Sequence, residues 1–90
     1  MAIERRRLRF KGRVQGVGFR HRAGYLAASL KLTGWVKNEY DDSVSMEVQG
    51  DSMMINKMLQ MLNTGSFIQI DWVDSEQIEL KEERSFRVLY

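Results

Sequence analysis

The stretch Gly12-Arg13-Val14-Gln15-Gly16-Val17-Gly18-Phe19-Arg20 separates two different hydrophobic patterns. Before it, Leu8 and Phe10 alternate with basic residues, which is the period of a strand. After it, apolar residues recur at three- and four-residue steps, which is the period of a helix: Phe19, Ala23, Leu26, Ala27 and Leu30. The sequence therefore predicts a strand, a glycine-rich turn and a helix whose first turn carries Arg20.

The glycine-rich turn has properties that suit anion binding. Glycine adopts backbone conformations closed to other residues and lets a ligand approach the main chain. The N–H groups at the start of a helix lack partners within the helix and, together with the helix dipole, favour negative charge. Arg20 adds a guanidinium whose fork geometry fits phosphate or carboxylate. Because the spacing matches neither the dinucleotide fingerprint nor the P-loop, a tight turn with a solvated Arg20 is the alternative to a phosphate cradle.

Composition limits the chemistry that this chain can perform. With 90 residues and 43% apolar content, residues 1–90 are expected to form a single domain with an ordinary core. The chain has no cysteine and one histidine, His21, which excludes a structural zinc site, a Cys–His pair and a Ser–His–Asp triad. A catalyst built from it would work by positioning and electrostatics. No secretory signal and no membrane-length apolar run are present, so we expect a cytoplasmic monomer.

Basic residues are concentrated at the start of the chain, although the net charge is only +2. Such a patch could bind nucleic acid, raise the local concentration of anions near the turn, or form a solvated strand face paired with acidic neighbours. Its members are Arg5, Arg6, Arg7, Arg9, Lys11, Arg13, Arg20 and Arg22.

The whole chain predicts the element order β-α-β-β-α-β followed by a terminal strand. Two helices on one face of a mostly antiparallel sheet, with right-handed crossovers, give an α+β, ferredoxin-like split β-α-β fold. The charged face of the first strand indicates that the other face of the sheet is open to water. The expected elements are strand 5–14, a helix from Gly18 or Phe19 to Lys31, strands 35–40 and 43–49, helix 53–62, strand 67–73 and a strand over 86–90.

Periodicity also predicts where individual side chains point. In the third strand Val44, Met46 and Val48 face the core, and Glu47 faces the basic first strand. The second helix starts at a cap formed by residues 50–52 and ends at Gly65 as a left-handed C-cap. Its apolar stripe, and the core residues of the fourth strand, are expected to be Met54, Ile55, Met58, Leu59, Met61, Leu62, Ile68, Ile70 and Trp72.

Asn38 is an unusual residue to find within a strand. One interpretation is that it lies near the hairpin at Asp41-Asp42 and makes turn contacts. The other is that its amide, which both donates and accepts hydrogen bonds, orients a water molecule. The pair Asp41-Asp42 is a less favourable hairpin turn than Asp-Gly, because one of the two aspartates has to adopt a positive φ.

The nine residues from Gly12 to Arg20, together with Gly34-Trp35-Val36-Lys37-Asn38, closely resemble the two signature stretches of the acylphosphatase family. The likeness continues through residues 41–44, 47–50 and 86–90, and so spans nearly the whole chain. The sequence departs from the family at Lys31 and Asp42, where glycine is common, and at residues 63–66, which lack the usual Gly-Pro. These positions lie outside the proposed site.

The resemblance implies an acylphosphatase, an enzyme that hydrolyses acyl phosphates to a carboxylate and inorganic phosphate without metal or cofactor. It implies that Asn38 positions the attacking water, while loop amides and Arg20 hold the phosphoryl group. The implied phosphate-binding residues are Gln15, Gly16, Val17, Gly18, Phe19 and Arg20. We expect a small-molecule acyl phosphate as substrate, a phosphate or sulfate ion at the loop, and neither a membrane nor nucleic acid as partner. His21, next to Arg20, is expected to point elsewhere.

Two other functions are compatible with the same pattern. One is a non-catalytic domain that binds phosphate or acyl phosphate, as a sensor or as part of a larger carbamoyl-phosphate-handling protein. The other is an RNA-binding module with an open sheet face. The first strand presents arginines where an RNA-recognition module would present stacking aromatics, which argues against RNA.

Overall fold

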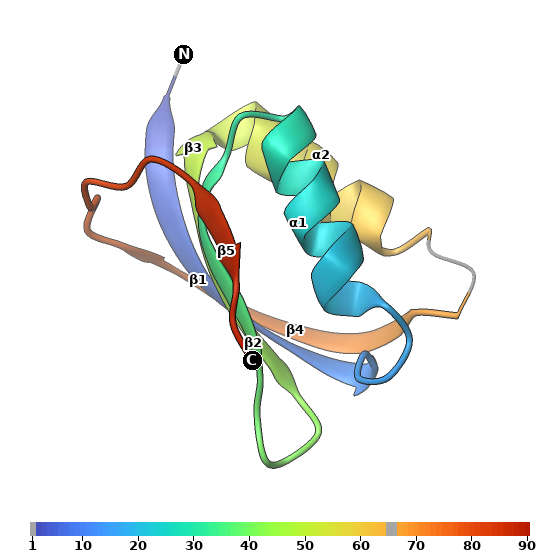
Figure 1. Ribbon diagram of the computed structural model, residues 1–90. Coiled ribbons are helices and arrows are strands. Elements are labelled where there is room, and N and C mark those ends of the chain that lie inside the picture. The colour runs from blue at the N-terminus through green and yellow to red at the C-terminus, as the bar shows by residue number, and fades with distance from the viewer. Residues whose placement is uncertain (1, 65–66) are drawn as a thin grey trace.

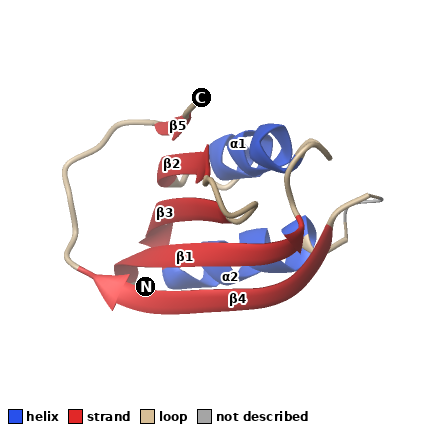
Figure 2. Ribbon diagram, turned by 90° about the horizontal axis from the view of Figure 1, so that it is seen from below, coloured by secondary structure: helices blue, strands red, loops and turns tan. Residues whose placement is uncertain are grey.

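A five-stranded sheet carries two helices on one of its faces (Figure 1). The computed structural model describes residues 2–64 and 67–90. The strand order is β4-β1-β3-β2-β5, and only the pair β2–β5 is parallel (Figure 2). This arrangement confirms the ferredoxin-like α+β fold. The elements are β1 Ile3–Arg13, α1 Phe19–Ser29, β2 Thr33–Asn38, β3 Val44–Asp51, α2 Ser52–Leu62, β4 Gln69–Ile78 and β5 Phe86–Val88.

The core lies between the sheet and the helices, and the residues of β3 that it contains are those that alternation predicted. Val44, Met46 and Val48 have no exposed surface. Burying one such side chain stabilises the fold by about 1.5–3 kcal/mol. The helix α2 begins as expected, with the Asp51 carboxylate accepting a hydrogen bond from the Met53 N–H at 2.9 Å. The other buried apolar residues are Leu8, Phe10, Val14, Phe19, Ala23, Leu26, Ala27, Leu32, Val36, Ile55, Met58, Leu62 and Ile68.

A β-bulge between β1 and β4 overturns one core prediction. Lys11 pairs with Trp72 and Gly12 pairs with Ile70, so Asp71 is an extra residue on β4. The extra residue reverses the alternation, and Trp72 is therefore 60% exposed instead of buried. Gly12 has φ 126°, and a Cβ there would lie 2.3 Å from the Gln69 carbonyl oxygen, so the bulge requires glycine at this position.

Other predicted boundaries shift by a few residues. β1 begins at Ile3, two residues before the expected start, and β4 covers Gln69–Ile78 where a strand over 67–73 was expected. α1 ends at Ser29, before Lys31. Met61 is exposed at the edge of the apolar stripe of α2. The expected C-cap at Gly65 lies outside the described residues. No helix in the described part of the chain is long and apolar enough to cross a membrane.

The uncovered face of the sheet is only partly open to water, contrary to expectation. β4 and β5 occupy opposite edges, so the connection 79–85 must pass the three strands between them. Where it passes, Lys81 exchanges two backbone hydrogen bonds with the side chain of Gln49. Arg5 lies beneath it with no exposed surface and binds Glu47 and Glu83. Arg5 and Arg7 of the basic strand are thus paired with acidic neighbours, as one of the three interpretations predicted, but Arg5 is buried and not solvated.

Lys31 and Asp42 adopt left-handed conformations, with φ 58° and 70°. At both positions the sequence departs from the glycine that is common in the family it resembles, and the left-handed region costs other residues about 1–2 kcal/mol. We predict that Lys31→Gly raises the free energy of unfolding by about 1 kcal/mol, measured by urea denaturation. Lys57→Gly, on the exposed face of α2, is the matched control and should lower it by about 1 kcal/mol. Equal destabilisation by both variants would contradict the conclusion that the left-handed backbone at Lys31 is strained.

Glu47 is 3% exposed and should make folding stability depend on pH. Burial alone would raise the pKa of Glu47, but hydrogen bonds from Arg5, Arg7 and Lys81 outweigh burial and lower this pKa below its usual value. Since the folded pKa lies below the unfolded one, the stabilisation is present above about pH 4 and is lost as pH falls further.

We predict that Glu47→Gln lowers the free energy of unfolding by about 2–4 kcal/mol at pH 7, because it leaves the buried Arg5 with Glu83 as its one remaining carboxylate partner among the described residues. The difference from the unmodified protein should be smaller at pH 3 than at pH 7, because the stabilisation by the Glu47 charge declines as the pH falls below about 4. Urea unfolding at both pH values measures it, with the exposed Glu82→Gln as control. A difference that stays constant with pH would show that the charge of Glu47 is not what matters.

Candidate functional site

The loop between β1 and α1 is shaped by two left-handed glycines. Gly16 has φ 72° and Gly18 has φ 81°, a region that side-chain-bearing residues adopt at a cost. A Cβ at either position would meet no atom within 4 Å. The requirement for glycine is therefore conformational, and the space beside the loop stays open for a ligand.

The helix α1 begins without a cap. Gly18 provides no side-chain hydrogen bond, and the first turn has no acidic residue. The Arg22 N–H donates to the Gly18 carbonyl at 3.0 Å, so the three preceding amides have no partner within the helix. Phe19 is buried with its ring 5.0 Å from that of Phe10, which fixes this helix end to the core. The result is a rigid set of N–H donors that favours an anion.

Arg20 is held by the residues that follow β5. Its Nη1 donates to the Leu89 carbonyl at 2.7 Å, and its guanidinium carbon lies 4.7 Å from the centroid of the Tyr90 ring. Leu89 is itself fixed, because its N–H donates to the Val36 carbonyl at 2.8 Å. The sequence reasoning missed Leu89 and Tyr90 as supports of Arg20. The contact spans 69 residues, and no local pattern could have indicated it.

Asn38 is the last residue of β2, opposite Val44 in β3. Its Oδ1 atom is buried and accepts no hydrogen bond from the described residues. A buried polar atom without a partner costs about 1–3 kcal/mol. This oxygen makes no turn contact with the described residues and is available to a donor from outside the chain.

These groups meet around one small hollow of about 180 Å³. Of the predicted site residues, Gly16, Gly18, Phe19, Arg20 and Asn38 line it, together with Val14 and His21. His21 was expected to point away from the site, but it also lines the hollow. The reason is that consecutive residues of a first helical turn all present their backbone at the helix end.

Two predicted loop residues do not line this hollow. Val17 packs against the core. The side chain of Gln15 donates to the carbonyls of Glu39 and Ser43, at 2.8 and 2.9 Å. Neither side chain is in a position to bind a ligand in the hollow.

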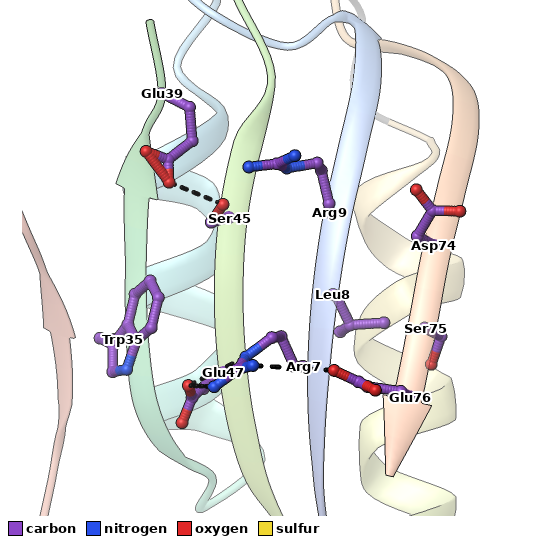
Figure 3. Close-up of a pocket in the computed structure, with 10 residues that line it drawn as sticks. All are labelled: Arg7, Leu8, Arg9, Trp35, Glu39, Ser45, Glu47, Asp74, Ser75 and Glu76. Carbon is purple, nitrogen blue, oxygen red and sulfur yellow. Dashed lines mark hydrogen bonds and ion pairs between the residues drawn. The ribbon is translucent and has the colours of Figure 1, made fainter. Parts of the chain in front are cut away.

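A larger hollow of about 560 Å³ lies on the uncovered face of the sheet (Figure 3). Its lining contains the two arginines Arg7 and Arg9 and four carboxylates, those of Glu39, Glu47, Asp74 and Glu76. Arg7 lies between Glu47 and Glu76, at 3.1 and 3.7 Å. Glu39 accepts a hydrogen bond from Ser45 at 2.9 Å. This hollow therefore lacks the strong positive potential that binding to a nucleic-acid backbone requires.

Comparison with known proteins shows which family shares this arrangement. The acylphosphatase family model matches residues 6–88. An acylphosphatase of Clostridium acetobutylicum is 38% identical over 90 residues, which is 98% of this chain and 99% of that protein. The structure of an acylphosphatase from Coxiella burnetii superposes with a TM-score of 0.89 at 31% identity, covering 97% of this chain and 93% of the other. The Bacillus subtilis acylphosphatase superposes with a TM-score of 0.90 at 28% identity, covering 99% and 100%.

The Tyr90 ring should contribute to anion binding through Arg20. A cation–π contact at an exposed site is worth about 0.5–1 kcal/mol, so we predict that Tyr90→Ala weakens the binding of inorganic phosphate by about threefold. Isothermal titration calorimetry measures this affinity. Tyr90→Phe keeps the ring and should bind phosphate like the unmodified protein. Equal losses in both variants would mean that the hydroxyl, and not the ring, supports Arg20.

Proposed function

The chain belongs to the acylphosphatase family of enzymes, which hydrolyse acyl phosphates, and on this premise we propose how its residues carry out the reaction. The amides of the loop and of the first turn of α1 hold the phosphoryl group, Arg20 binds its oxygens, and Asn38 orients the attacking water. The site needs no metal or cofactor, and phosphate or sulfate occupies the same hollow.

One observation carries this assignment. The Oδ1 atom of Asn38 is buried, lacks a partner among the described residues, and belongs to the hollow that the uncapped end of α1 and Arg20 also line. A fully ionised phosphoryl group satisfies the amides and the guanidinium, but it has no O–H group to donate to Oδ1. A water molecule beside the anion can, because its O–H groups are donors. The hollow thus offers adjacent places for a phosphoryl group and for water.

The chemistry of an acyl phosphate fits these few residues. Water attacks phosphorus, the bond from phosphorus to the acyl oxygen breaks, and that oxygen leaves with the electron pair as part of a carboxylate. A carboxylate is a weak base and needs no general acid. A loose phosphoryl-transfer transition state mainly requires charge stabilisation and in-line placement of the water. Fixed N–H donors and Arg20 supply the charge stabilisation without reorganising during the reaction.

Asn38 is too weakly basic to accept a proton. In this proposal Asn38 holds the water by accepting a hydrogen bond from one of its O–H groups. A phosphoryl oxygen takes a proton from the water as the bond between the water oxygen and phosphorus forms. The products are then the carboxylate and dihydrogen phosphate, so charge and atoms balance. We also propose that the protein is cytoplasmic and monomeric, as expected from the sequence. Size-exclusion chromatography with light scattering tests whether it is a monomer.

The proposal predicts different kinetic effects for the two side chains. Asn38→Ala should lower kcat for benzoyl phosphate about 100-fold or more and change KM little, because water is positioned but the phosphoryl group is still bound. Arg20→Ala should lower kcat about 100- to 1000-fold and also weaken phosphate binding about tenfold, since it removes a charge-assisted contact present in both states. Hydrolysis is followed with EDTA present, which the proposal expects to have no effect.

Arg22→Ala is the matched control for Arg20→Ala. Arg22 lies on the same helix, but it donates to the Met61 carbonyl at 2.8 Å and does not line the hollow, so this variant should keep kcat within about twofold. Normal turnover by folded Asn38→Ala would refute the water-positioning role. Loss of activity in EDTA, restored by a divalent cation, would refute metal independence.

A further inference from the structure

The side chain of Gln15 joins the phosphate loop to the hairpin between β2 and β3. Its half-buried Nε2 donates to the Glu39 carbonyl at 2.8 Å and to the Ser43 carbonyl at 2.9 Å. A primary amide has two N–H donors, and both are used here. The two bonds cross 24 and 28 residues of sequence, so they are tertiary contacts that hold two segments together.

The hairpin that receives these bonds is itself well fixed. The Glu39 N–H donates to the Ser43 carbonyl at 2.9 Å. The Asp41 carboxylate accepts from the Ser43 N–H at 3.1 Å, and the hydrogen bonds from Ser43 lower the pKa of Asp41. Asn38 immediately precedes Glu39, so a displacement of the hairpin backbone would move Asn38 as well.

Sheet pairing does not provide the same connection. The register between β1 and β3 ends at Phe10 opposite Val44, and residues 11–13 of β1 pair only with β4. Beyond that point, β1 and the loop have lost their backbone bonds to the strand that leads out of the hairpin. The amide of Gln15 bridges the two segments where the sheet no longer does.

We propose that Gln15 is a positioning residue that sets the distance between the bound phosphoryl group and the water held by Asn38. This inference rests on the proposed function. The loop amides and Arg20 are on one side of the link, and Asn38 is on the other. Gln15 does not line the hollow and touches neither reactant. Reacting atoms must lie about 3–3.5 Å apart in line, and a displacement of 1 Å can cost about 100-fold in rate.

The role of Gln15 has a kinetic signature. Loss of the link should lower kcat but leave the affinity for inorganic phosphate unchanged, because every phosphate-binding group stays on the loop side. A side chain that bound phosphate directly would lower both. A side chain that only stabilised the fold would lower the melting temperature without changing kcat.

The test uses Gln15→Met, which keeps the length of the side chain and removes both donors. We expect kcat for benzoyl phosphate to fall about tenfold and the Kd for inorganic phosphate, from calorimetry, to stay within about twofold. Gln77→Met, at an exposed position of β4, is the control and should change neither. Gln15→Asn keeps the amide on a stem one methylene too short. It is the second variant if Gln15→Met does not fold, and we expect the same fall in kcat and the same unchanged Kd.

A double-mutant cycle with Asn38→Ala decides whether Gln15 acts through Asn38. In the Asn38→Ala background, Gln15→Met should change kcat by less than twofold. A further tenfold loss, or normal kcat in folded Gln15→Met and Gln15→Asn, would overturn the inference while leaving the proposed function in place. Absence of hydrolysis by the unmodified protein would overturn both.

Discussion

The site depends on how the chain turns from β1 into α1. The turn must be made in five residues, 14–18, because β1 ends at Arg13 and the buried ring of Phe19 already packs beside Phe10. Two left-handed glycines make the turn possible, and the second of them cannot cap the helix with a side chain. The same constraint that packs the helix onto the sheet therefore leaves its amides free for an anion. Packing and the proposed phosphate binding are two consequences of one local geometry.

The remaining parts of the site come from distant segments, and the uncovered face of the sheet is needed to bring one of them into place. The connection 79–85 crosses from β4 to β5 over the buried ion pair of Arg5 and Glu47. This crossing lets β5 pair with β2, and the residues after β5 then reach Arg20. The ion pair of Arg5 and Glu47 thus supports the orientation of the Arg20 guanidinium on α1, although neither Arg5 nor Glu47 lines the smaller hollow.

Local patterns were sufficient to predict the fold, and the resemblance to the acylphosphatases indicated five of the residues that line the smaller hollow, namely Gly16, Gly18, Phe19, Arg20 and Asn38. The alternation of Val44, Met46 and Val48 and the cap at Asp51 are determined by neighbours in sequence, and both predictions are confirmed. Trp72 was misplaced because a bulge adds one residue to a strand without changing its composition. The burial of Arg5, the support of Arg20 and the long-range bonds of Gln15 all follow from strand order and tertiary packing, which periodicity does not encode. The roles of Asn38 and Arg20 remain proposals that rest on the shape of the hollow.

The central claim is that the loop and the uncapped end of α1 form the phosphate site. A titration of the isotope-labelled protein with inorganic phosphate, followed through backbone amide NMR shifts, tests it most directly. We predict that the amide chemical shifts of Gly16, Gly18, Phe19 and Arg20 change together and saturate with one common affinity. The amide chemical shifts of β1 around Arg7 and Arg9 should not change. Saturable shifts along the arginine-rich strand, with the loop amides unchanged, would contradict it.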